Sequence, residues 1–254
     1  MSKSMEQPGT AWVTGAGTGI GRAVALKLAR TGWRVAASAR TKADLDALSA
    51  EAGGNIVPVP LDVRDAEAVD TGFAEMEKTL GSVDLVVLCA GIYRRDTART
   101  LDPKEFEATV TTNLVGTANC LAAVMPAMMA RKAGRIGVVG SVVGYVGLPG
   151  ASAYGATKAA LINLCQSLYP ELMANGVQLS LISPGFVETP LTDKNDFPMP
   201  FMISAEEAAN HIVKGLGSAR FDIAFPWKMV VAMRLLAALP SRLLFAVTNR
   251  VLWK

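Results

Sequence analysis

The 254-residue sequence contains few of the residues that build metal centres and disulfide frameworks. Its single histidine, His211, excludes most histidine-based metal sites and any catalytic scheme that needs several histidines. The three cysteines, Cys89, Cys120 and Cys165, are odd in number and far apart in the sequence. They predict reduced thiols in a cytoplasmic compartment, without disulfides. We therefore expect no metal site.

The sequence also lacks a strong charge of either sign and long apolar runs. Its net charge is +3, from 25 Lys and Arg against 22 Asp and Glu, which gives no reason to expect a nucleic-acid partner. Residues 1–9 are polar and lack the apolar core of a secretory signal. No charge-free apolar run reaches 18 residues, so we expect no ordinary transmembrane helix.

With 51% hydrophobic and 19% charged residues, the chain is long and apolar enough to fold around one sizeable core. Runs typical of strands are residues 11–13, 33–37, 56–61, 85–88, 135–139, 177–182 and 223–225. Segments with apolar residues at helical spacing are residues 20–29, 43–50, 66–80, 104–110, 115–130, 153–173 and 206–216. This alternation predicts an α/β fold, a single doubly wound parallel sheet with helices on both faces. We expect this domain to span residues 1–225.

A glycine-rich segment, Thr14 to Gly21, joins the first strand to the first helix. The common dinucleotide pattern G-x-G-x-x-G does not fit from Gly15, because position 20 is Ile. The pattern G-x-x-x-G-x-G does fit, with Gly15, Gly19 and Gly21. Glycines here let the backbone approach a pyrophosphate at the start of a helix. The alternative is a glycine-rich turn without a ligand.

The end of the second strand bears on the choice of cofactor. Sites that prefer NAD usually carry an acidic residue there for the ribose 2′-hydroxyl, whereas an arginine accommodates the 2′-phosphate of NADP. This chain has Arg40 and no acidic residue until Asp44. The planar guanidinium suits a phosphate, so we expect NADP(H) to be preferred over NAD(H). Alternatively, Arg40 is a surface residue at the strand end.

A tyrosine, a lysine and a serine form a candidate catalytic set. Tyr154 and Lys158 are four residues apart in an expected helix and so share one face. A nearby ammonium favours the phenolate, so we expect Lys158 to lower the pKa of Tyr154 and to let it exchange a proton with an alcohol or carbonyl oxygen. Ser141 follows the fifth strand, at the edge where α/β sheets bind ligands.

Together these residues resemble the short-chain dehydrogenase/reductase family. The resemblance covers about Thr10 to Thr189. The motifs that carry it, in the family's order and spacing, are Thr14 to Gly21, Asp62-Val63, Ala90-Gly91, Asn113, Gly140-Ser141, Tyr154 with Lys158, and Pro184-Gly185-Phe186-Val187-Glu188-Thr189.

The resemblance implies a role for each catalytic residue. Tyr154 would be the general acid/base, and Lys158 would bind the nicotinamide ribose and lower the Tyr154 pKa. Ser141 would hydrogen-bond the substrate oxygen. Asn113 would help to hold a water in a proton relay with Lys158. The alternative for Asn113 is a helix-breaking surface amide.

The resemblance also implies cofactor contacts. Asp62 and Val63 would flank the adenine, and Val187 and Thr189 would lie near the carboxamide and phosphates. Alternatively, Asp62 is the N-cap of the helix that starts at Ala66. The full expected set is Thr14, Gly15, Gly17, Thr18, Gly19, Ile20, Gly21, Arg40, Asp62, Val63, Ala90, Gly91, Tyr154, Lys158, Pro184, Gly185, Val187 and Thr189.

The sequence departs from the family pattern at three places. Cys89 stands where Asn is usual, which questions local stability more than chemistry. Thr18 stands where many NADP-dependent members have a basic residue, so the NADP preference rests on Arg40. Finally, the chain continues beyond the last expected strand.

That C-terminal extension, residues 226–254, is predicted to be helical, basic and apolar. From residue 223 onward there is no acidic residue, whereas Lys228, Arg234, Arg242, Arg250 and Lys254 add five positive charges. Such a helix suits burial against the protein's own cleft or a sister subunit. It also suits peripheral attachment to an anionic membrane. Arg234 and Pro240 argue against a spanning helix.

The expected substrate-side loops are apolar as well. Residues 145–148 and 197–202 carry Met, Phe, Tyr and Leu, which suit an apolar ligand or ordinary core packing. Arg94 and Arg95 are candidates for an acidic head group or solvated loop charges. We therefore expect an enzyme that transfers a hydride between NADP(H) and an apolar carbonyl/alcohol substrate, as a homodimer or homotetramer. The alternative is a catalytically silent NADP(H)-binding or membrane-surface scaffold protein.

Overall fold

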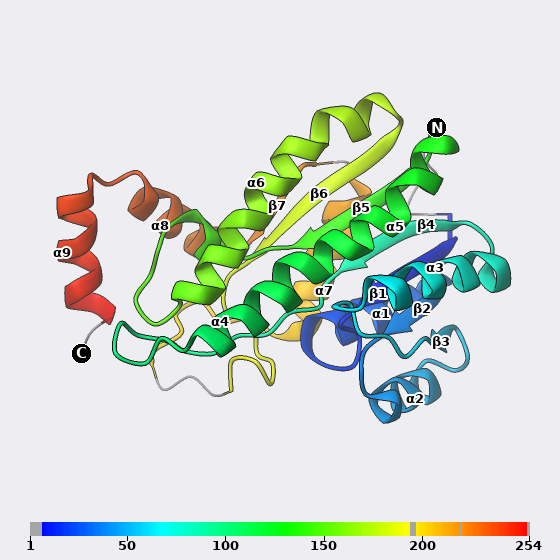
Figure 1. Ribbon diagram of the computed structural model, residues 1–254, viewed down its shortest axis with the longest axis horizontal. Coiled ribbons are helices and arrows are strands. Elements are labelled where there is room, and N and C mark those ends of the chain that lie inside the picture. Colours follow the sequence, from blue (N-terminus) through cyan, green and yellow to red (C-terminus); the bar gives the residue numbers. More distant parts are fainter. Residues whose placement is uncertain (1–6, 194–196, 219, 253–254) are drawn as a thin grey trace.

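In the described residues, 7–193, 197–218 and 220–252 of this computed structural model, seven parallel strands form one sheet (Figure 1). Their order is β3-β2-β1-β4-β5-β6-β7, so the chain reverses direction across the sheet between β1 and β4. The strands are β1 (Thr10–Thr14), β2 (Arg34–Ser38), β3 (Ile56–Pro58), β4 (Val83–Leu88), β5 (Gly134–Val139), β6 (Val177–Pro184) and β7 (Asp222–Phe225). This arrangement confirms the predicted doubly wound sheet.

Helices cover both faces of the sheet. The helices are α1 (Gly19–Arg30), α2 (Lys42–Glu51), α3 (Ala66–Leu80), α4 (Pro103–Val110), α5 (Gly116–Ala130), α6 (Ser152–Ala174), α7 (Ala205–Gly217), α8 (Trp227–Ala237) and α9 (Ser241–Leu252). A π-helical turn, η1 (Thr111–Val115), joins α4 to α5, and a 3-10 turn, η2 (Val142–Tyr145), follows β5. Side-chain caps fix several starts: Asp65 accepts a hydrogen bond from the Ala68 amide, and Ser204 accepts one from Glu207.

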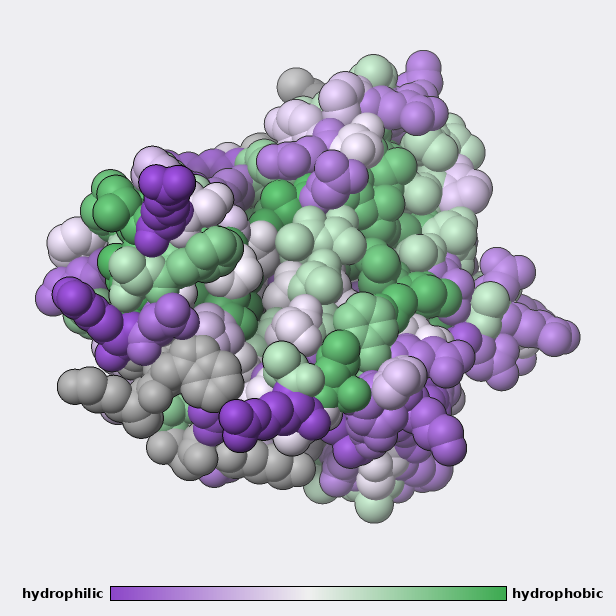
Figure 2. Space-filling model, turned by 60° about the vertical axis from the view of Figure 1, so that its left-hand side comes forward, coloured by the Kyte–Doolittle hydropathy of each residue, from purple (hydrophilic) through white to green (hydrophobic). Residues whose placement is uncertain are grey.

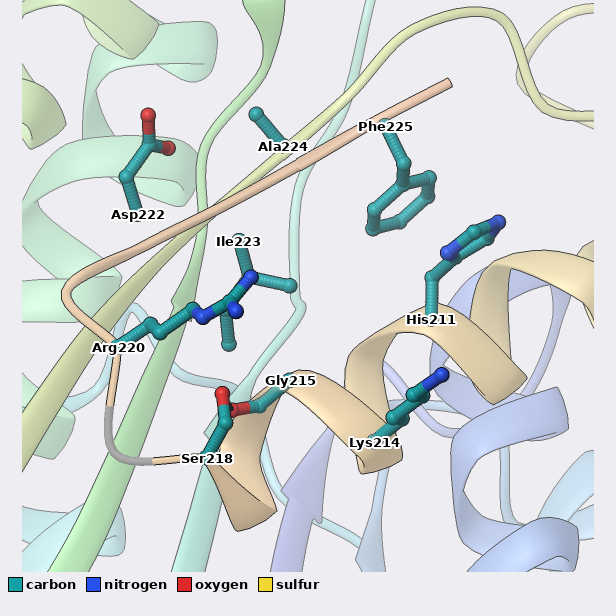
Figure 3. A pocket seen from close by; sticks show the side chains of 9 residues that line it. All are labelled: His211, Lys214, Gly215, Ser218, Arg220, Asp222, Ile223, Ala224 and Phe225. Atoms are coloured by element: carbon teal, nitrogen blue, oxygen red, sulfur yellow. Dashed lines mark hydrogen bonds between the residues drawn. The ribbon is translucent and has the colours of Figure 1, made fainter. Parts of the chain in front are cut away.

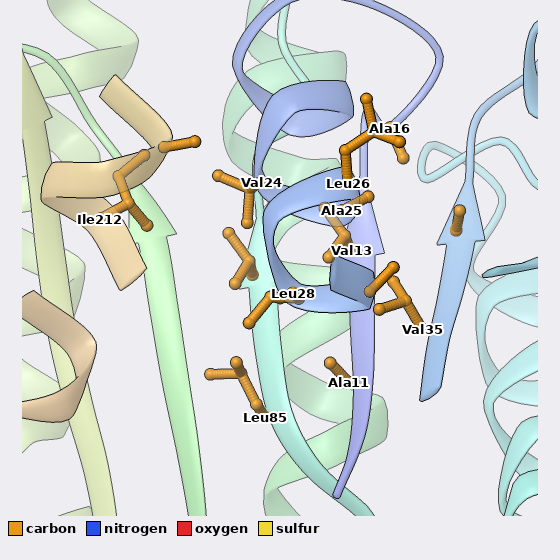
Figure 4. Close-up of a cluster of buried hydrophobic side chains, with 14 of the residues drawn as sticks. Ala11, Val13, Ala16, Val24, Ala25, Leu26, Leu28, Val35, Leu85 and Ile212 are labelled. Atoms are coloured by element: carbon orange, nitrogen blue, oxygen red, sulfur yellow. The ribbon is translucent and has the colours of Figure 1, made fainter. Parts of the chain in front are cut away.

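Alternating strand residues build two separate cores. Ala11 and Val13 of β1 point toward α1, where they pack with Val24 and Leu28 (Figure 4). Trp12, between them, points to the opposite face, where α3, α5 and α6 supply the other core. This two-sided burial explains why the strands read as continuous apolar runs rather than as alternating ones.

The helical stretch 103–130 differs from the prediction of two separate helices. The π turn η1 keeps the path helical, with one wider turn that carries Asn113 inward. Within the described residues, this is the one stretch long and apolar enough to cross a membrane. Leu121 and Val124 of α5 are nevertheless buried on the sheet, as expected for a covering helix. Strand β3 ends at Pro58, earlier than predicted.

The C-terminal extension forms α8 and α9, at the left of Figure 1. Met229, Val230 and Met233 of α8 are buried against Val142 of η2, directly after β5. The predicted apolar helix is therefore buried on one side only. Arg234 pairs with Asp222 of β7. Of the five predicted positive charges, Lys254 lies outside the described residues.

Candidate active site

The predicted site residues gather where parallel strands end. Thr14 ends β1, Cys89 follows β4, Ser141 follows β5 by two residues, and Pro184 ends β6. Because these strands are parallel neighbours in the sheet, their carboxyl ends share one edge. That edge contains the point where the strand order reverses, which is where doubly wound sheets bind ligands.

The glycine loop folds tightly between β1 and α1. Gly15 has a φ of 64°, and a Cβ on it would lie 2.8 Å from the backbone of Ala90. A Cβ on Gly21 would lie 2.3 Å from the carbonyl oxygen of Gly15. The Thr14 hydroxyl accepts hydrogen bonds from the amides of Cys89 (3.1 Å) and Ala90 (3.3 Å), which ties the loop to the end of β4.

The start of α1 fits the pyrophosphate of a dinucleotide. Thr18 occupies the N-cap position without a side-chain capping bond, and the first turn contains no acidic residue. The first amides of the helix are therefore not satisfied by a side-chain cap, and the positive end of the helix dipole is not neutralised within its first turn. The loop and the start of the helix, residues 15 and 17–21, would hold the phosphates, because backbone amides at the start of a helix bind anions.

A segment far along the chain meets this loop. A Cβ on Gly19 would lie 3.1 Å from the Thr189 side chain, so the residues after β6 lie against the glycine loop. Val187 is buried and bridges to Ile203. The Gly185 amide donates to the Phe225 carbonyl at 2.7 Å. The structure therefore brings the predicted Pro184-to-Thr189 segment and the glycine loop together.

Charged residues surround the predicted adenosine end. Arg40 is exposed at the end of β2. The pKa of Asp62 lies below its usual range, chiefly because Arg64 hydrogen-bonds the carboxylate (Nη2 to Oδ2, 2.6 Å), with a smaller effect from the Arg40 charge. Asp62 is not the cap of α3, since Asp65 caps that helix. The side chain of Asp44 lies close to Gly17, which places an acidic group near the loop as well.

Val63, which was predicted to flank the adenine, packs against α5. Its side chain is buried, and a Cβ on Gly116 would lie 2.6 Å from it, so α5 approaches closely here. Asn119 donates a hydrogen bond to the Val63 carbonyl at 3.0 Å. These contacts fix the segment after β3 against α5.

Ser141 and Tyr154 lie next to each other in the site. The Ser141 hydroxyl accepts from the Val143 amide (3.2 Å) and reaches the Pro184 carbonyl (3.4 Å). Burial raises the pKa of Tyr154 to about 12, although a hydrogen bond with Ser141 lowers it in part. At neutral pH the phenol therefore keeps its proton.

Lys158 is buried beside this pair. Its Nζ donates to the Val139 carbonyl at 2.8 Å and lies 5.4 Å from the Tyr154 ring centroid. Burial lowers the Lys158 pKa to about 8. The expected lowering of the Tyr154 pKa by Lys158 is not found. Burial of the phenol raises this pKa, and the hydrogen bond with Ser141, not the ammonium, is what lowers it.

Asn113 is fully buried in η1, which excludes a surface amide. Its Oδ1 accepts from the Ile92 amide (2.7 Å), and its Nδ2 donates to the Ile92 carbonyl (2.9 Å) and the Thr157 hydroxyl (3.2 Å). Its side chain thus ties the loop after β4 to the catalytic helix α6. Gly91 lies between, since a Cβ on it would be 3.3 Å from Asn113 and 3.8 Å from Lys158 Nζ.

Two residues of this site were not predicted from the sequence. Asp96, only 8% exposed, accepts hydrogen bonds from the amides of Ser152 (2.6 Å) and Ala153 (2.8 Å) and from the Ser152 hydroxyl (2.6 Å). It thereby caps α6 one turn ahead of Lys158, next to Tyr154. Tyr93 packs edge-on against the Tyr154 ring at 5.2 Å. Asp96 lies 56 residues before Ser152, so no local capping pattern reveals it.

Two hollows of the surface lie away from the glycine loop. One of about 300 Å³ lies between α7 and β7, where His211 stacks on Phe225 at 4.9 Å (Figure 3). Another, of about 280 Å³, is lined by Arg94, Arg95, Asp96 and Ala153, beside the start of α6. No cluster of three or more possible metal ligands occurs in the part of the chain that the structure describes.

Comparisons with known proteins agree with this arrangement. A family model described as short chain dehydrogenase matches residues 9–198. An uncharacterized oxidoreductase of Myxococcus xanthus is 39% identical over 245 residues, covering 95% of this chain and 97% of that protein. A 3-oxoacyl-[acyl-carrier-protein] reductase of Escherichia coli is 37% identical over 182 residues, covering 72% of this chain and 75% of the relative.

A solved structure shows the same architecture. The crystal structure of a short-chain dehydrogenase from Streptomyces avermitilis superposes with a TM-score of 0.83 at 26% identity, covering 96% of this chain and 97% of that one. The family match spans most of the chain and includes the glycine loop, Ser141, Tyr154 and Lys158. The chain belongs to the short-chain dehydrogenase family.

Proposed function

We propose that this oxidoreductase reduces an apolar carbonyl compound with NADPH, and oxidises the corresponding alcohol in the reverse direction. The observation that carries the proposal is the position of Ser141, Tyr154 and Lys158 at the strand edge where the uncapped start of α1 also lies. NADPH, when bound, supplies the hydride. The chain's own residues supply orientation and the proton.

The proposed reduction places the substrate oxygen between two hydroxyl groups. Ser141 donates a hydrogen bond to the oxygen and orients it, after giving up its long contact with the Pro184 carbonyl (3.4 Å). Tyr154 transfers its proton to the same oxygen as charge develops there. Because burial raises its pKa to about 12, Tyr154 carries the required proton at neutral pH.

Lys158 and Asn113 support that proton transfer. The ammonium of Lys158 stabilises the phenolate left behind, and its pKa of about 8 lets it lose and regain a proton near neutral pH. Asn113 keeps α6 fixed to the loop after β4 through Thr157 and Ile92. In the reverse direction Tyr154 must first lose its proton, so alcohol oxidation should become faster as the pH rises.

The NADP preference rests on Arg40 and its surroundings. Arg40 and Arg64 both lie near Asp62, so two guanidinium groups are present at the end of β2 and after β3. They favour the extra negative charge of a 2′-phosphate. Asp44, close to Gly17, opposes it. We propose that the attraction of the two arginines for the 2′-phosphate is larger than the repulsion by Asp44, because Arg40 is exposed and available to a phosphate.

The apolar substrate class rests on the loops around Tyr154. Tyr145, Val146 and Leu148 pack with α8, and Phe186 packs edge-on with Phe197 at 6.0 Å. Relatives named 3-oxoacyl-[acyl-carrier-protein] reductases make a 3-oxoacyl group one candidate within this class.

The chain is further proposed to form a homodimer or homotetramer and to act in the cytoplasm. The outer face of α5 exposes only apolar side chains and a proline, which suits contact with a second copy. Its exposed residues are Val115, directly before the helix, and Ala118, Ala122, Pro126 and Ala130. In Figure 2, hydrophobic side chains gather over the helices that cover this face of the sheet. The three free cysteines suit a reducing compartment.

An enzyme panel tests the proposed function. Purified protein is mixed with NADPH or NADH and with apolar ketones, 3-oxoacyl thioesters and small polar ketones, and loss of the reduced cofactor is followed. We expect turnover with NADPH, at a rate that increases with the apolar character of the substrate. Cofactor binding without turnover on any carbonyl would favour the silent scaffold instead.

A further inference from the structure

One side of α8 exposes large apolar side chains in a regular row. Trp227, Val231 and Leu235 are 70%, 47% and 65% exposed. Their spacing of four residues places them on one helix face. The opposite face, with Met229, Val230 and Met233, is buried on η2. Helix α8 is therefore fixed to the fold while its outer apolar row faces solvent.

A loop from another part of the chain extends this row. Phe201 and Met202 are 47% and 45% exposed, and Phe201 has a φ of 60°, a strained conformation for a bulky residue. The Nζ of Lys228 lies 5.8 Å from the Phe201 ring and 5.9 Å from the Trp227 ring, so the loop and α8 meet around one cation. Strain that holds an aromatic ring in solvent points to a use for that ring.

Helix α9 adds more residues of the same kinds. We call the exposed residues of the Phe201 loop, α8 and α9 together the tail surface. Its apolar members are Phe201, Met202, Trp227, Val231, Leu235, Leu243, Phe245 and Val247. Leu243 and Val247 share one face of α9, and Phe245 lies on the other side of that helix. Lys228, Arg242 and Arg250 are exposed on the same two helices. At the left of Figure 2, purple and green side chains alternate in this region.

The charge of the tail surface indicates which kind of partner it binds. Residues 223–254 contain five positive and no negative residues. Arg234 pairs with Asp222 and Lys254 lies outside the described residues, so Lys228, Arg242 and Arg250 are the cations that this surface presents. Two copies meeting through this surface would bring like charges together. An anionic lipid bilayer instead accepts the apolar row and attracts the cations, and tryptophan is favoured at the boundary between lipid and water.

The tail surface is connected to the site by a short series of contacts. Arg95 lies over the Phe197 ring at 5.6 Å, in the segment that leads to Phe201. Two residues before Arg95, Tyr93 contacts the Tyr154 ring at 5.2 Å. Helix α8 itself packs on η2, which starts next to Ser141. The surface therefore borders the substrate side of the catalytic edge.

We propose that the tail surface docks on an anionic bilayer and that the enzyme takes its apolar carbonyl substrate from that bilayer. The second half rests on the proposed reductase function. Docking through α8 and the Phe201 loop would hold the entrance beside Tyr93 and Tyr154 against the lipid, so the substrate need not cross water.

Vesicle binding tests the docking. Full-length protein is sedimented with vesicles of phosphatidylcholine alone or mixed with phosphatidylglycerol, at low and high salt. We expect binding to the anionic vesicles that decreases with salt. Leu235→Ser and Trp227→Ser should each weaken the partition coefficient about tenfold or more, the effect expected for one large apolar side chain.

Met173→Ser is the matched control. Met173 is 40% exposed at the end of α6 remote from Ser152, about 30 Å along the helix. It should leave vesicle binding unchanged. Absence of binding to every vesicle, equal weakening by Met173→Ser, or a self-associated form that Leu235→Ser dissociates without any lipid binding would each overturn the docking.

Kinetics test the substrate half separately. Leu235→Ser should keep kcat/KM within about twofold for a water-soluble ketone, yet lose most activity on a long-chain ketone dissolved in anionic vesicles. Equal activity of the variant and the original protein on the vesicle substrate would overturn this half. If no ketone is reduced at all, the proposed function fails, and vesicle binding alone would still support the docking.

Discussion

Removal of the Asp96 carboxylate should weaken both the fold and the chemistry. Asp96 holds the first turn of α6 through two backbone amides and the Ser152 hydroxyl, at 2.6–2.8 Å. Hydrogen bonds to a charged group contribute about 1.5–3 kcal/mol each. Because Ser152 is exposed, water can replace the hydrogen bond that its hydroxyl loses, which reduces the cost. We therefore expect Asp96→Ala to lower the free energy of unfolding by about 2–4 kcal/mol.

The effect on catalysis follows from the neighbouring position of Tyr154. A misplacement of about 1 Å at a reacting group can reduce the rate about 100-fold. We expect Asp96→Ala to reduce kcat by about 10- to 100-fold with little change in NADPH affinity, because the glycine loop lies elsewhere. Asp96→Asn keeps one acceptor oxygen and should be intermediate.

Urea unfolding and steady-state kinetics measure the two effects. A loss of stability below about 0.5 kcal/mol, the usual range for a plain surface substitution, would refute this role of Asp96. So would an unchanged kcat in a folded Asp96→Ala variant. Circular dichroism shows whether each variant is folded before its kinetics are interpreted.

The same carboxylate predicts a pH dependence. Burial by itself raises the pKa of Asp96, but hydrogen bonds from Ser152 and Ala153 outweigh it, so the pKa in the folded protein is lowered. A lowered folded pKa contributes stability above the unfolded value of about 4, and this contribution disappears as the pH falls through the folded pKa. The stability difference between the original protein and Asp96→Asn should therefore shrink below about pH 4.

Three further substitutions test the cofactor site and the subunit interface. Arg40→Asp should raise the Kd for NADPH about tenfold or more while sparing NADH, measured by fluorescence titration; an unchanged preference would place phosphate recognition elsewhere. Gly21→Ala puts a methyl group 2.3 Å from the Gly15 carbonyl oxygen, so both cofactors should bind poorly in a folded protein; normal binding would contradict the tight loop. Ala122→Arg on the exposed face of α5 should reduce the oligomer size in light scattering; an unchanged size would exclude this face as the interface.

Much of the fold follows from periodicity because both sheet faces are buried. Strands such as Leu85 to Leu88 read as unbroken apolar runs, and each amphipathic helix between them covers one face. The π turn η1 was not predicted. Its buried Asn113 bonds Ile92, 21 residues earlier in the chain, and a local sequence pattern does not show such a contact. The division of α8 into a buried and an exposed face also depends on η2, a partner distant in sequence.

The site residues could be predicted where their motifs are local in the sequence. Properties that depend on burial, such as pKa values, could not be predicted in this way. Tyr154 and Lys158 share a helix face by spacing alone. Their pKa values depend on how far burial removes each group from water, and the sequence spacing gives no information on that burial. Asp96 and Tyr93 were not predicted because their hydrogen-bond partners are distant in the sequence. Asp96 bonds Ser152, 56 residues away, and Tyr93 bonds Gly150, 57 residues away.

The turnover of Tyr154→Phe tests most directly whether Tyr154 donates the proton. This variant removes only the Oη that transfers the proton, and the ring keeps its edge-on contact with Tyr93. We expect kcat for an apolar ketone to fall about 10²–10⁴-fold, with NADPH affinity within about twofold of the original. A variant that binds NADPH and retains more than about a tenth of the original kcat would contradict the role of Tyr154 as the proton donor.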